Sequence, residues 1–213
     1  SLSLDERFRG FEIVVCEATG NHPHPANRGA MWFRFTIDTS GTDYNAMDIL
    51  PFLITELAGE GRKLRQETNQ PLFPRDYVQV SFGTLNSFGR HTSGINDYLP
   101  FELTVCCKNG ASAKAAARLP EIIAAGVKDY CVVYPDRTRE IDEHTGQAKL
   151  AAHYRLTPLT ETSQEQVHKL EVFGLGGHMS TLALRDNAII KAGYVLQGVI
   201  CAFKNLPGIS LQV

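Results

Sequence analysis

Residues 30–38 read AMWFRFTID, and this stretch decides the fold class that the sequence predicts. Its apolar and polar residues alternate, which is typical of a β-strand because successive side chains of a strand point to opposite faces. The apolar face, which we expect to pack on helices, consists of Met31, Phe33, Phe35 and Ile37. Trp32 falls on the opposite face, where an aromatic side chain suits a subunit interface, and packing on a helix is the open alternative.

Five further elements are predicted after this strand. A helix is expected over residues 44–64, because its apolar residues recur at helical spacing. The others are strands at 77–85 and 99–107, a helix at 113–127 with Ser112 as its cap and Gly126 at its end, and a strand at 151–156. The order strand-helix-strand-strand-helix-strand over residues 29–157 is the ferredoxin-like, split βαβ pattern. We therefore expect an α+β fold with the helices on one face of the sheet.

A C-terminal β-α-β unit is expected to follow. It has a strand at 169–174, a turn at 176–178, a helix at 186–203 and a strand at 209–213. The chain then divides into a lead-in strand and loop (1–28), a ferredoxin-like domain (29–157) and the C-terminal unit packed on it (158–213). Because Asn45-Ala46 and Asn187-Ala188 both open a long helix, the C-terminal unit is interpretable as a partial repeat, with chance similarity equally open.

The composition excludes several classes of protein. The net charge of −2 is spread over scattered residues, which argues against a dedicated surface for nucleic acid or anionic membranes. No apolar run approaches the roughly 20 residues of a membrane-spanning helix, and the first residues do not form a signal peptide. The five cysteines include no Cys-x-x-Cys pair. Reduced thiols are the simplest interpretation, so we expect a cytoplasmic protein.

The cysteines and histidines predict no metal ion in this chain. Cys106 and Cys107 are adjacent and would point to opposite faces of a strand, so they are poorly placed to bind one metal. His22 and His24 flank Pro23 in a loop without a nearby cysteine, and their spacing matches no familiar metal site. We therefore expect no cofactor in this chain.

No complete catalytic site is predicted either. Ser93, His91 and Asp97 share one loop, which lacks the strand-turn-helix setting of a nucleophilic serine. The glycines of residues 174–177 follow a strand and precede a helix, but their spacing departs from the dinucleotide-binding fingerprint.

Several motifs, taken in order, resemble a known domain. Residues 171–180 (EVFGLGGHMS) and 186–192 (DNAIIKA) combine a strand, a glycine-rich turn with a histidine, and a helix opening at Asn-Ala-Ile. Similar motifs are found at 17–19 (EAT), 28–35 (RGAMWFRF), 82–89 (FGTLNSFG) and 94–100 (GINDYLP). Together they resemble the lid domain of the zinc hydrolase superfamily that includes acetylornithine deacetylase, aminoacylase, succinyl-diaminopimelate desuccinylase and carboxypeptidase G. The resemblance covers residues 11–130 and 167–203.

The resemblance implies a substrate-binding role for two residues. His178 matches the lid histidine, which reaches the substrate carbonyl, often in the neighbouring subunit's site, and stabilises developing negative charge. Asn96 approximately matches the lid asparagine. The alternatives are an exposed turn histidine and a turn asparagine that tolerates unusual backbone angles.

The sequence also departs from the family pattern. Asp43 and Tyr44 stand at the turn where the first half would carry a lid histidine, and no Gly-His-x-Asp turn or Glu-Glu pair is found. The resemblance therefore implies that this chain alone is inactive and that zinc belongs to the parent protein.

These observations lead to two main functional hypotheses, and an enzyme that uses His178 and nearby carboxylates in an unfamiliar way is a third. The first is a non-catalytic lid and dimerisation portion of a zinc-dependent metallopeptidase or amidohydrolase that acts on peptide or N-acyl amino acid bonds. It implies a homodimer formed through a sheet edge and a helix. The alternative is a stand-alone ferredoxin-like binding or assembly module with no enzymatic activity.

Overall fold

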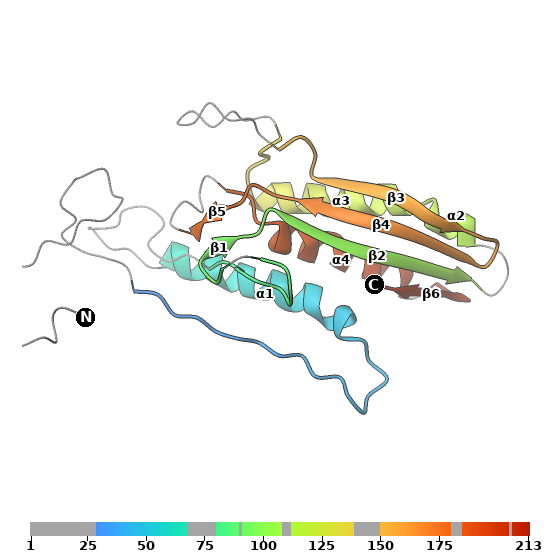
Figure 1. The fold of residues 1–213 in the computed structure, drawn as a ribbon, viewed down its shortest axis with the longest axis horizontal. Coiled ribbons are helices and arrows are strands. Elements are labelled where there is room, and N and C mark those ends of the chain that lie inside the picture. The colour runs from blue at the N-terminus through green and yellow to red at the C-terminus, as the bar shows by residue number, and fades with distance from the viewer. Residues whose placement is uncertain are drawn as a thin grey trace, which may run out of the picture. The chain divides into compact units, whose positions relative to one another are not determined.

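The computed structural model describes residues 29–67, 80–89, 91–107, 112–138, 150–179, 185–204 and 206–213. The predicted lead-in strand and loop at 1–28 lies outside these residues. Of the two compact units, Ser1–Met31 and Trp32–Val213, the second contains all the described helices and strands. They are α1 (Ala46–Glu67), β1 (Gly94–Ile95), β2 (Tyr98–Cys107), α2 (Ser112–Ala116), α3 (Leu119–Val133), β3 (Tyr154–Glu161), β4 (Glu165–Phe173), β5 (Gly177–His178), α4 (Ala188–Phe203) and β6 (Ile209–Gln212) (Figure 1).

The main sheet is antiparallel and has the strand order β3-β4-β2-β6. β4 lies inside the sheet, between β2 and β3 (Figure 1). Leu99 lies opposite Val172 and Leu103 lies opposite His168, so these four side chains share one face. All four are buried, and this face forms the floor of the hydrophobic core.

α4 forms the centre of the core. It packs against α3, against α1 and on the sheet, and its side chains are buried around most of its circumference. The close crossing of α3 and α4 needs a glycine, since a Cβ added to Gly126 would lie 2.8 Å from the Cα of Val195. Fully burying one Val, Leu or Ile side chain contributes about 1.5–3 kcal/mol. Burial of α4 is therefore a main source of stability for this fold.

The strand-helix-strand-strand-helix-strand order occurs over residues 98–212, as β2-α3-β3-β4-α4-β6, and not over residues 29–157. The difference arises because β3 and β4 form a hairpin and β4 then inserts next to β2. β4 and β6 thus belong to the same sheet as β2, and α4 belongs to the same core. The boundary expected between residues 157 and 158 falls within β3.

The strand predicted at residues 30–38 is wrong. Residues 29–39 have no regular secondary structure, and Figure 1 shows residues 32–38 as a separate blue trace outside the four-stranded sheet. Phe33 and Phe35 of the expected apolar face are 72% and 58% exposed, so this face does not pack on the helices. The physical reason is that no strand in the described part of the chain offers this segment a hydrogen-bonded ladder.

Other expectations are confirmed or corrected element by element. Those confirmed are the helix at 44–64 (α1), the strand at 99–107 (β2), the strand at 169–174 (within β4), the helix at 186–203 (α4) and the strand at 209–213 (β6). The strand at 151–156 begins and ends later, as β3. Of the strand predicted at 77–85, residues 80–85 are described, and they contain an isolated bridge at Leu85 instead of a strand.

The helix predicted at 113–127 is split and longer than expected. It becomes α2 and α3, and α3 continues to Val133 because Gly126 serves the contact with α4 and does not end the helix. Ser112 lies inside α2 and is no cap: its hydroxyl donates to the carbonyl oxygens of Thr162 and Ser163 at 3.1 Å and 3.0 Å.

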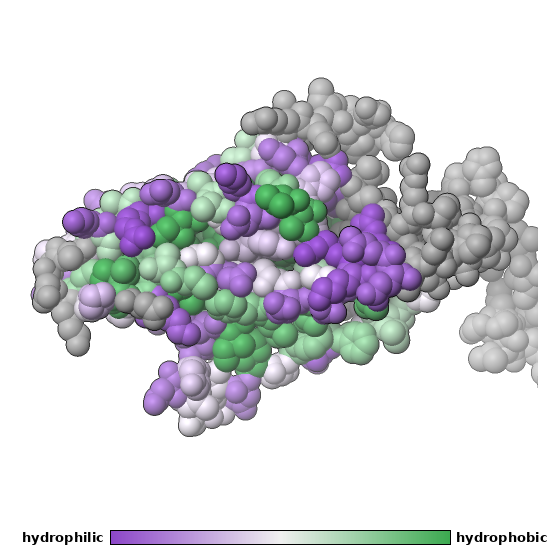
Figure 2. All heavy atoms as spheres, turned by 180° about the vertical axis from the view of Figure 1, so that it is seen from behind, coloured by the Kyte–Doolittle hydropathy of each residue, from purple (hydrophilic) through white to green (hydrophobic). Residues whose placement is uncertain are grey.

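The exposed surface is mixed in character. Figure 2 shows the molecule from behind, where apolar residues form separate patches among hydrophilic ones. In the described part of the chain, no helix has the length and apolar character required to cross a membrane.

Candidate functional site

The structure brings together the two turns that the sequence singled out. β1 and β5 pair in a small antiparallel sheet in which Gly94 lies opposite His178, and the Met179 N–H donates to the Ser93 carbonyl at 2.8 Å. Gly174 lies at the junction of these turns, and a Cβ added there would clash with backbone atoms of Asp186, Ala188 and Asn96. The glycine is therefore required where the end of β4, the turn at Asn96 and the start of α4 meet.

Asn96 and His178 have different environments in this junction. Asn96 is buried; its Oδ1 accepts from the Tyr98 N–H at 2.9 Å, and its carbonyl accepts from the Ala188 N–H at 2.8 Å. Its side-chain Nδ2 is buried and has no hydrogen-bond partner among the described residues. His178 is exposed on β5. Asn96 thus holds the junction in place, whereas His178 is accessible at the surface beside it.

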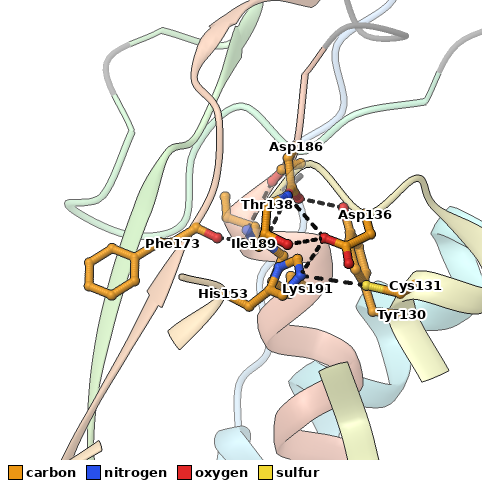
Figure 3. A network of polar contacts seen from close by, with 10 residues as sticks. Tyr130, Cys131, Asp136, Thr138, His153, Phe173, Asp186, Ile189 and Lys191 are labelled. Carbon is orange, nitrogen blue, oxygen red and sulfur yellow. Dashed lines mark hydrogen bonds and ion pairs between the residues drawn. The ribbon is translucent and has the colours of Figure 1, made fainter. Parts of the chain in front are cut away.

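A buried polar network includes the carbonyl of Phe173, the residue before Gly174. The Lys191 ammonium, on α4, donates to Asp186 Oδ2 and to the Phe173 carbonyl, both at 2.6 Å. The Tyr130 hydroxyl, on α3, donates to Asp186 Oδ1 at 2.6 Å (Figure 3). Lys191 and Asp186 are almost fully buried, so this ion pair is completed by hydrogen bonds as a buried pair requires.

Burial dominates the electrostatics of this network. Desolvation lowers the pKa of Lys191, although the neighbouring Asp186 carboxylate opposes that change. Desolvation, with Asp186 beside it, holds the pKa of the Tyr130 hydroxyl well above its usual range. Tyr130 therefore remains a hydrogen-bond donor throughout the physiological pH range. The hydrogen bonds of this network connect α3, α4 and the end of β4.

A second cluster lies next to this network and contains Cys131, Asp136 and His153 (Figure 3). His153 Nε2 lies 3.1 Å from Asp136 Oδ1 and 3.7 Å from Cys131 Sγ. Asp136 Oδ1 also accepts from the backbone N–H and the hydroxyl of Thr138, at 2.9 Å and 2.6 Å. The three donor groups come from the end of α3, from the turn that follows it and from the residue before β3.

The protonation preferences of this cluster follow from its hydrogen bonds and its burial. The two hydrogen bonds from Thr138 lower the pKa of Asp136 to about 2. Burial lowers the pKa of His153 and raises the pKa of Cys131. At neutral pH the apo cluster thus combines a carboxylate, a neutral imidazole and a protonated thiol.

This arrangement does not suit nucleophilic catalysis. In a Cys-His-Asp triad the thiol and the carboxylate contact different ring nitrogens. Here both contact Nε2 of His153, and Nδ1 is buried without a hydrogen-bond partner among the described residues. Three donor atoms that converge on one point are instead typical of a site that can hold a cation.

The remaining candidates from the sequence do not converge. His91 Nδ1 accepts from the Ser93 N–H at 3.1 Å, and Asp97 lies beside Gly176, so no Ser-His-Asp triad forms. His22 and His24 lie outside the described residues. Cys131, Asp136, His153 and Lys191 were not predicted as site residues from the sequence. A lysine within the apolar run of α4 and the Asp-x-Thr pair were the local signals, but the convergence of the cluster depends on the fold.

Comparisons with family models, curated proteins and solved structures found no match to this chain.

Proposed function

We propose that this chain is the non-catalytic lid and dimerisation portion of a zinc-dependent metallopeptidase or amidohydrolase that acts on peptide or N-acyl amino acid bonds. The observation that carries the proposal is the meeting of two turns far apart in the sequence. The turn containing Asn96 and the turn containing His178 pair through β1 and β5. The lid resemblance assigns substrate contacts to these same two turns.

The local architecture around His178 supports this proposal. A strand (β4) leads into a glycine-rich turn, and Asn187 then opens α4 by accepting from the Ile189 N–H at 2.9 Å. His178 is exposed at this turn, at a surface that another domain or subunit can approach. The order of elements from β2 to β6, with β4 and β2 as inner strands, supports a ferredoxin-like assignment of the sheet.

The edges of the sheet favour a second copy of this chain as the partner, paired along β6. β3 is an edge strand that contains Pro158 and a register shift, and both features hinder strand addition. β6 covers β2 from Thr104 onward, and the uncovered half of β2 contains Pro100. β6 itself contains no proline and has exposed side chains at Ser210 and Gln212. A dimer along β6 would continue one sheet across two subunits.

The dimer is tested by sedimentation of the full chain at micromolar concentration. We expect a dimer, and the double variant Ser210→Lys/Gln212→Lys should dissociate it, because like charges would face each other across the new strand pair. Thr157→Lys, an exposed position on the β3 edge, is the matched control and should leave the dimer intact. A monomeric wild-type chain, or dissociation by the control instead of the double variant, contradicts pairing along β6.

The lid role is tested with an N-acetyl amino acid as the probe. We expect NMR signals of residues 177–179 and of Asn96 to shift on titration of the isotopically labelled chain, and His178→Ala to abolish the shifts. His91→Ala, an exposed histidine in the neighbouring loop, should leave them unchanged. No hydrolysis of the probe is expected. The absence of shifts, or turnover that disappears with His178→Ala, contradicts a non-catalytic lid.

The alternative function is a stand-alone ferredoxin-like binding or assembly module. The exposed aromatic side chains of Trp32, Phe33 and Phe35 favour it, because such a segment can bind a partner protein without any enzyme attached. Under this alternative the N-acetyl amino acid produces no shifts near His178, whereas loss of the aromatic side chains weakens partner binding.

A further inference from the structure

We propose that Cys131, Asp136 and His153 form a binding site for a divalent transition-metal ion, with Zn²⁺ as the expected occupant. The site goes beyond the lid and dimerisation role and stands independently of it. It also differs from the zinc of the proposed parent enzyme, because its donors lie within this chain, and the sequence analysis expected none here.

Two of the three distances between the donor atoms fit tetrahedral zinc. With Zn–S near 2.3 Å and Zn–N and Zn–O near 2.0–2.1 Å, tetrahedral angles place a sulfur and a nitrogen about 3.6 Å apart and a nitrogen and an oxygen about 3.3 Å apart. Cys131 Sγ and His153 Nε2 are 3.7 Å apart, and His153 Nε2 and Asp136 Oδ1 are 3.1 Å apart. All three donor atoms lie within 4.8 Å of one another, so small side-chain adjustments would allow them to bind one metal ion together.

The chemistry of the donors selects the class of metal. A thiolate and an imidazole are preferred ligands of Zn²⁺ and similar borderline ions, whereas Mg²⁺ and Ca²⁺ prefer oxygen donors throughout. The protein supplies three donors, so a fourth position remains for water or another ligand.

The residues around the cluster position its oxygen donor and balance the charges near it. Thr138 holds the Asp136 carboxylate through two hydrogen bonds, so the oxygen donor is fixed before a metal arrives. When Zn²⁺ binds, the Cys131 S–H bond breaks, a Zn–S bond forms and the thiol proton leaves to solvent. The proton of the neutral His153 imidazole moves from Nε2 to Nδ1, so that the Nε2 lone pair forms the Zn–N bond. The metal with one thiolate and one carboxylate is then neutral. The nearby Lys191 charge is already balanced by Asp186 at 2.6 Å. The bound site therefore carries no net charge.

The site would tie two separate segments together. Cys131 and Asp136 belong to the end of α3 and the turn after it, and His153 immediately precedes β3. A metal bridge between them would close the connection from α3 to β3 and stabilise the folded chain in proportion to its occupancy.

Metal content tests the site directly. The full chain, stripped with chelator, incubated with Zn²⁺ and dialysed, should retain one zinc per chain, and Mg²⁺ should not compete. Cys131→Ser and His153→Gln should each lower retention at least tenfold. Cys201→Ser, an exposed thiol on α4, and His168→Gln, a buried histidine on β4, are the control variants and should retain zinc. No zinc in the wild type, or equal loss in the controls, overturns the proposal.

A second measurement uses the wild-type chain and so avoids variants that fail to fold. Substituting Co²⁺ should produce a thiolate-to-cobalt charge-transfer band and the intense visible bands of tetrahedral cobalt. In parallel, Zn²⁺ should slow alkylation of Cys131 while leaving that of Cys201 unchanged, as read by mass spectrometry of peptides. A charge-transfer band with protection at Cys16 instead of Cys131, or no band at all, overturns the assignment.

Discussion

Residues 32–38 and β4 differ in a way that reverses the expectation from their sequences. The segment at 32–38 (WFRFTID) is rich in aromatic side chains and alternates cleanly, yet it is exposed and forms no strand. β4 (EQVHKLEVF) carries charged and polar residues, yet it is an inner strand of the sheet and its Leu170 and Val172 are fully buried.

The difference shows what alternation does and does not determine. Alternation gives a segment one apolar face, but a strand forms only when its backbone N–H and C=O groups find a ladder. β4 has a ladder on both sides, whereas residues 32–38 have none in the described part of the chain. β4 forms a strand despite its polar residues because it pairs with β2 on one side and β3 on the other, and because α4 packs on it.

The largest expected effect comes from the buried ion pair of Asp186 and Lys191, which follows β4 in the chain. Lys191→Ala would leave the Asp186 carboxylate buried without its partner, so we expect a loss of about 3–5 kcal/mol in the free energy of unfolding. Arg34→Ala removes an exposed cation from the segment at 32–38 and should change stability by less than about 0.5 kcal/mol. Urea unfolding measures both. The double variant Lys191→Met/Asp186→Leu should be more stable than Lys191→Ala, and the reverse order would contradict an unpaired charge as the cause.

Apolar truncation gives the next largest contrast. Leu170→Ala creates a cavity beneath α4 and should cost about 2–5 kcal/mol, whereas Phe33→Ala at a 72% exposed position should cost less than about 0.5 kcal/mol. A comparable loss from Phe33→Ala in urea unfolding would show that the segment is packed in solution. If that loss also depended on protein concentration, a second copy of the chain would be covering it.

Much of the fold could be predicted wherever local patterns and tertiary packing agree. β2, α1, α4 and β6 were found because their periodicity, caps and turns act within the segment itself. The strand predicted at residues 30–38 does not form, because strand pairing depends on segments elsewhere in the chain. The same limit applies to the element order, which shifted to residues 98–212 once β4 inserted next to β2.

The candidate site residues also differ in whether a local motif or only the fold identifies them. Asn96 and His178 were found through motifs, and the fold then brought their two turns together. Cys131, Asp136 and His153 carry no shared motif, since the end of α3 and the start of β3 meet only in the folded chain. Cys131 was consequently interpreted as one more buried thiol.

A smaller difference in stability is expected between the two asparagines that precede α1 and α4, one exposed and one buried. Asn45 and Asn187 each accept a hydrogen bond from the residue two positions later, at 3.0 Å and 2.9 Å. Asn187 is also buried and donates to Ser81 Oγ and the Phe82 carbonyl, at 3.1 Å and 3.0 Å. Asn187→Ala should therefore cost about 1–2 kcal/mol, and Asn45→Ala about 0.5–1 kcal/mol. Equal losses in thermal unfolding would show that the additional bonds of Asn187 contribute little.

The smallest expected effect is the loss of folding stability at low pH, which should differ between two similar turns that each begin with an aspartate. Asp38 and Asp136 each accept a backbone and a hydroxyl hydrogen bond from the residue two positions later, Ser40 and Thr138. Both carboxyl pKa values are lowered mainly by these bonds, and that of Asp136 falls from 3.8 to about 2. A lowered pKa in the folded state means that the stabilisation is complete above the unfolded pKa and is lost as pH falls toward the folded pKa.

The test is the pH dependence of stability in metal-free protein, with chelator present so that metal binding does not contribute. Between about pH 4 and pH 2 the wild-type chain should lose stability partly through Asp136, with the neighbouring His153 already protonated in the unfolded chain. Asp136→Asn should flatten this slope more than Asp38→Asn does, because Asp38 lies in the exposed segment where water competes for the same hydrogen bonds. Equal slopes in the two variants would mean that the folded environment of Asp136 adds nothing to its local turn.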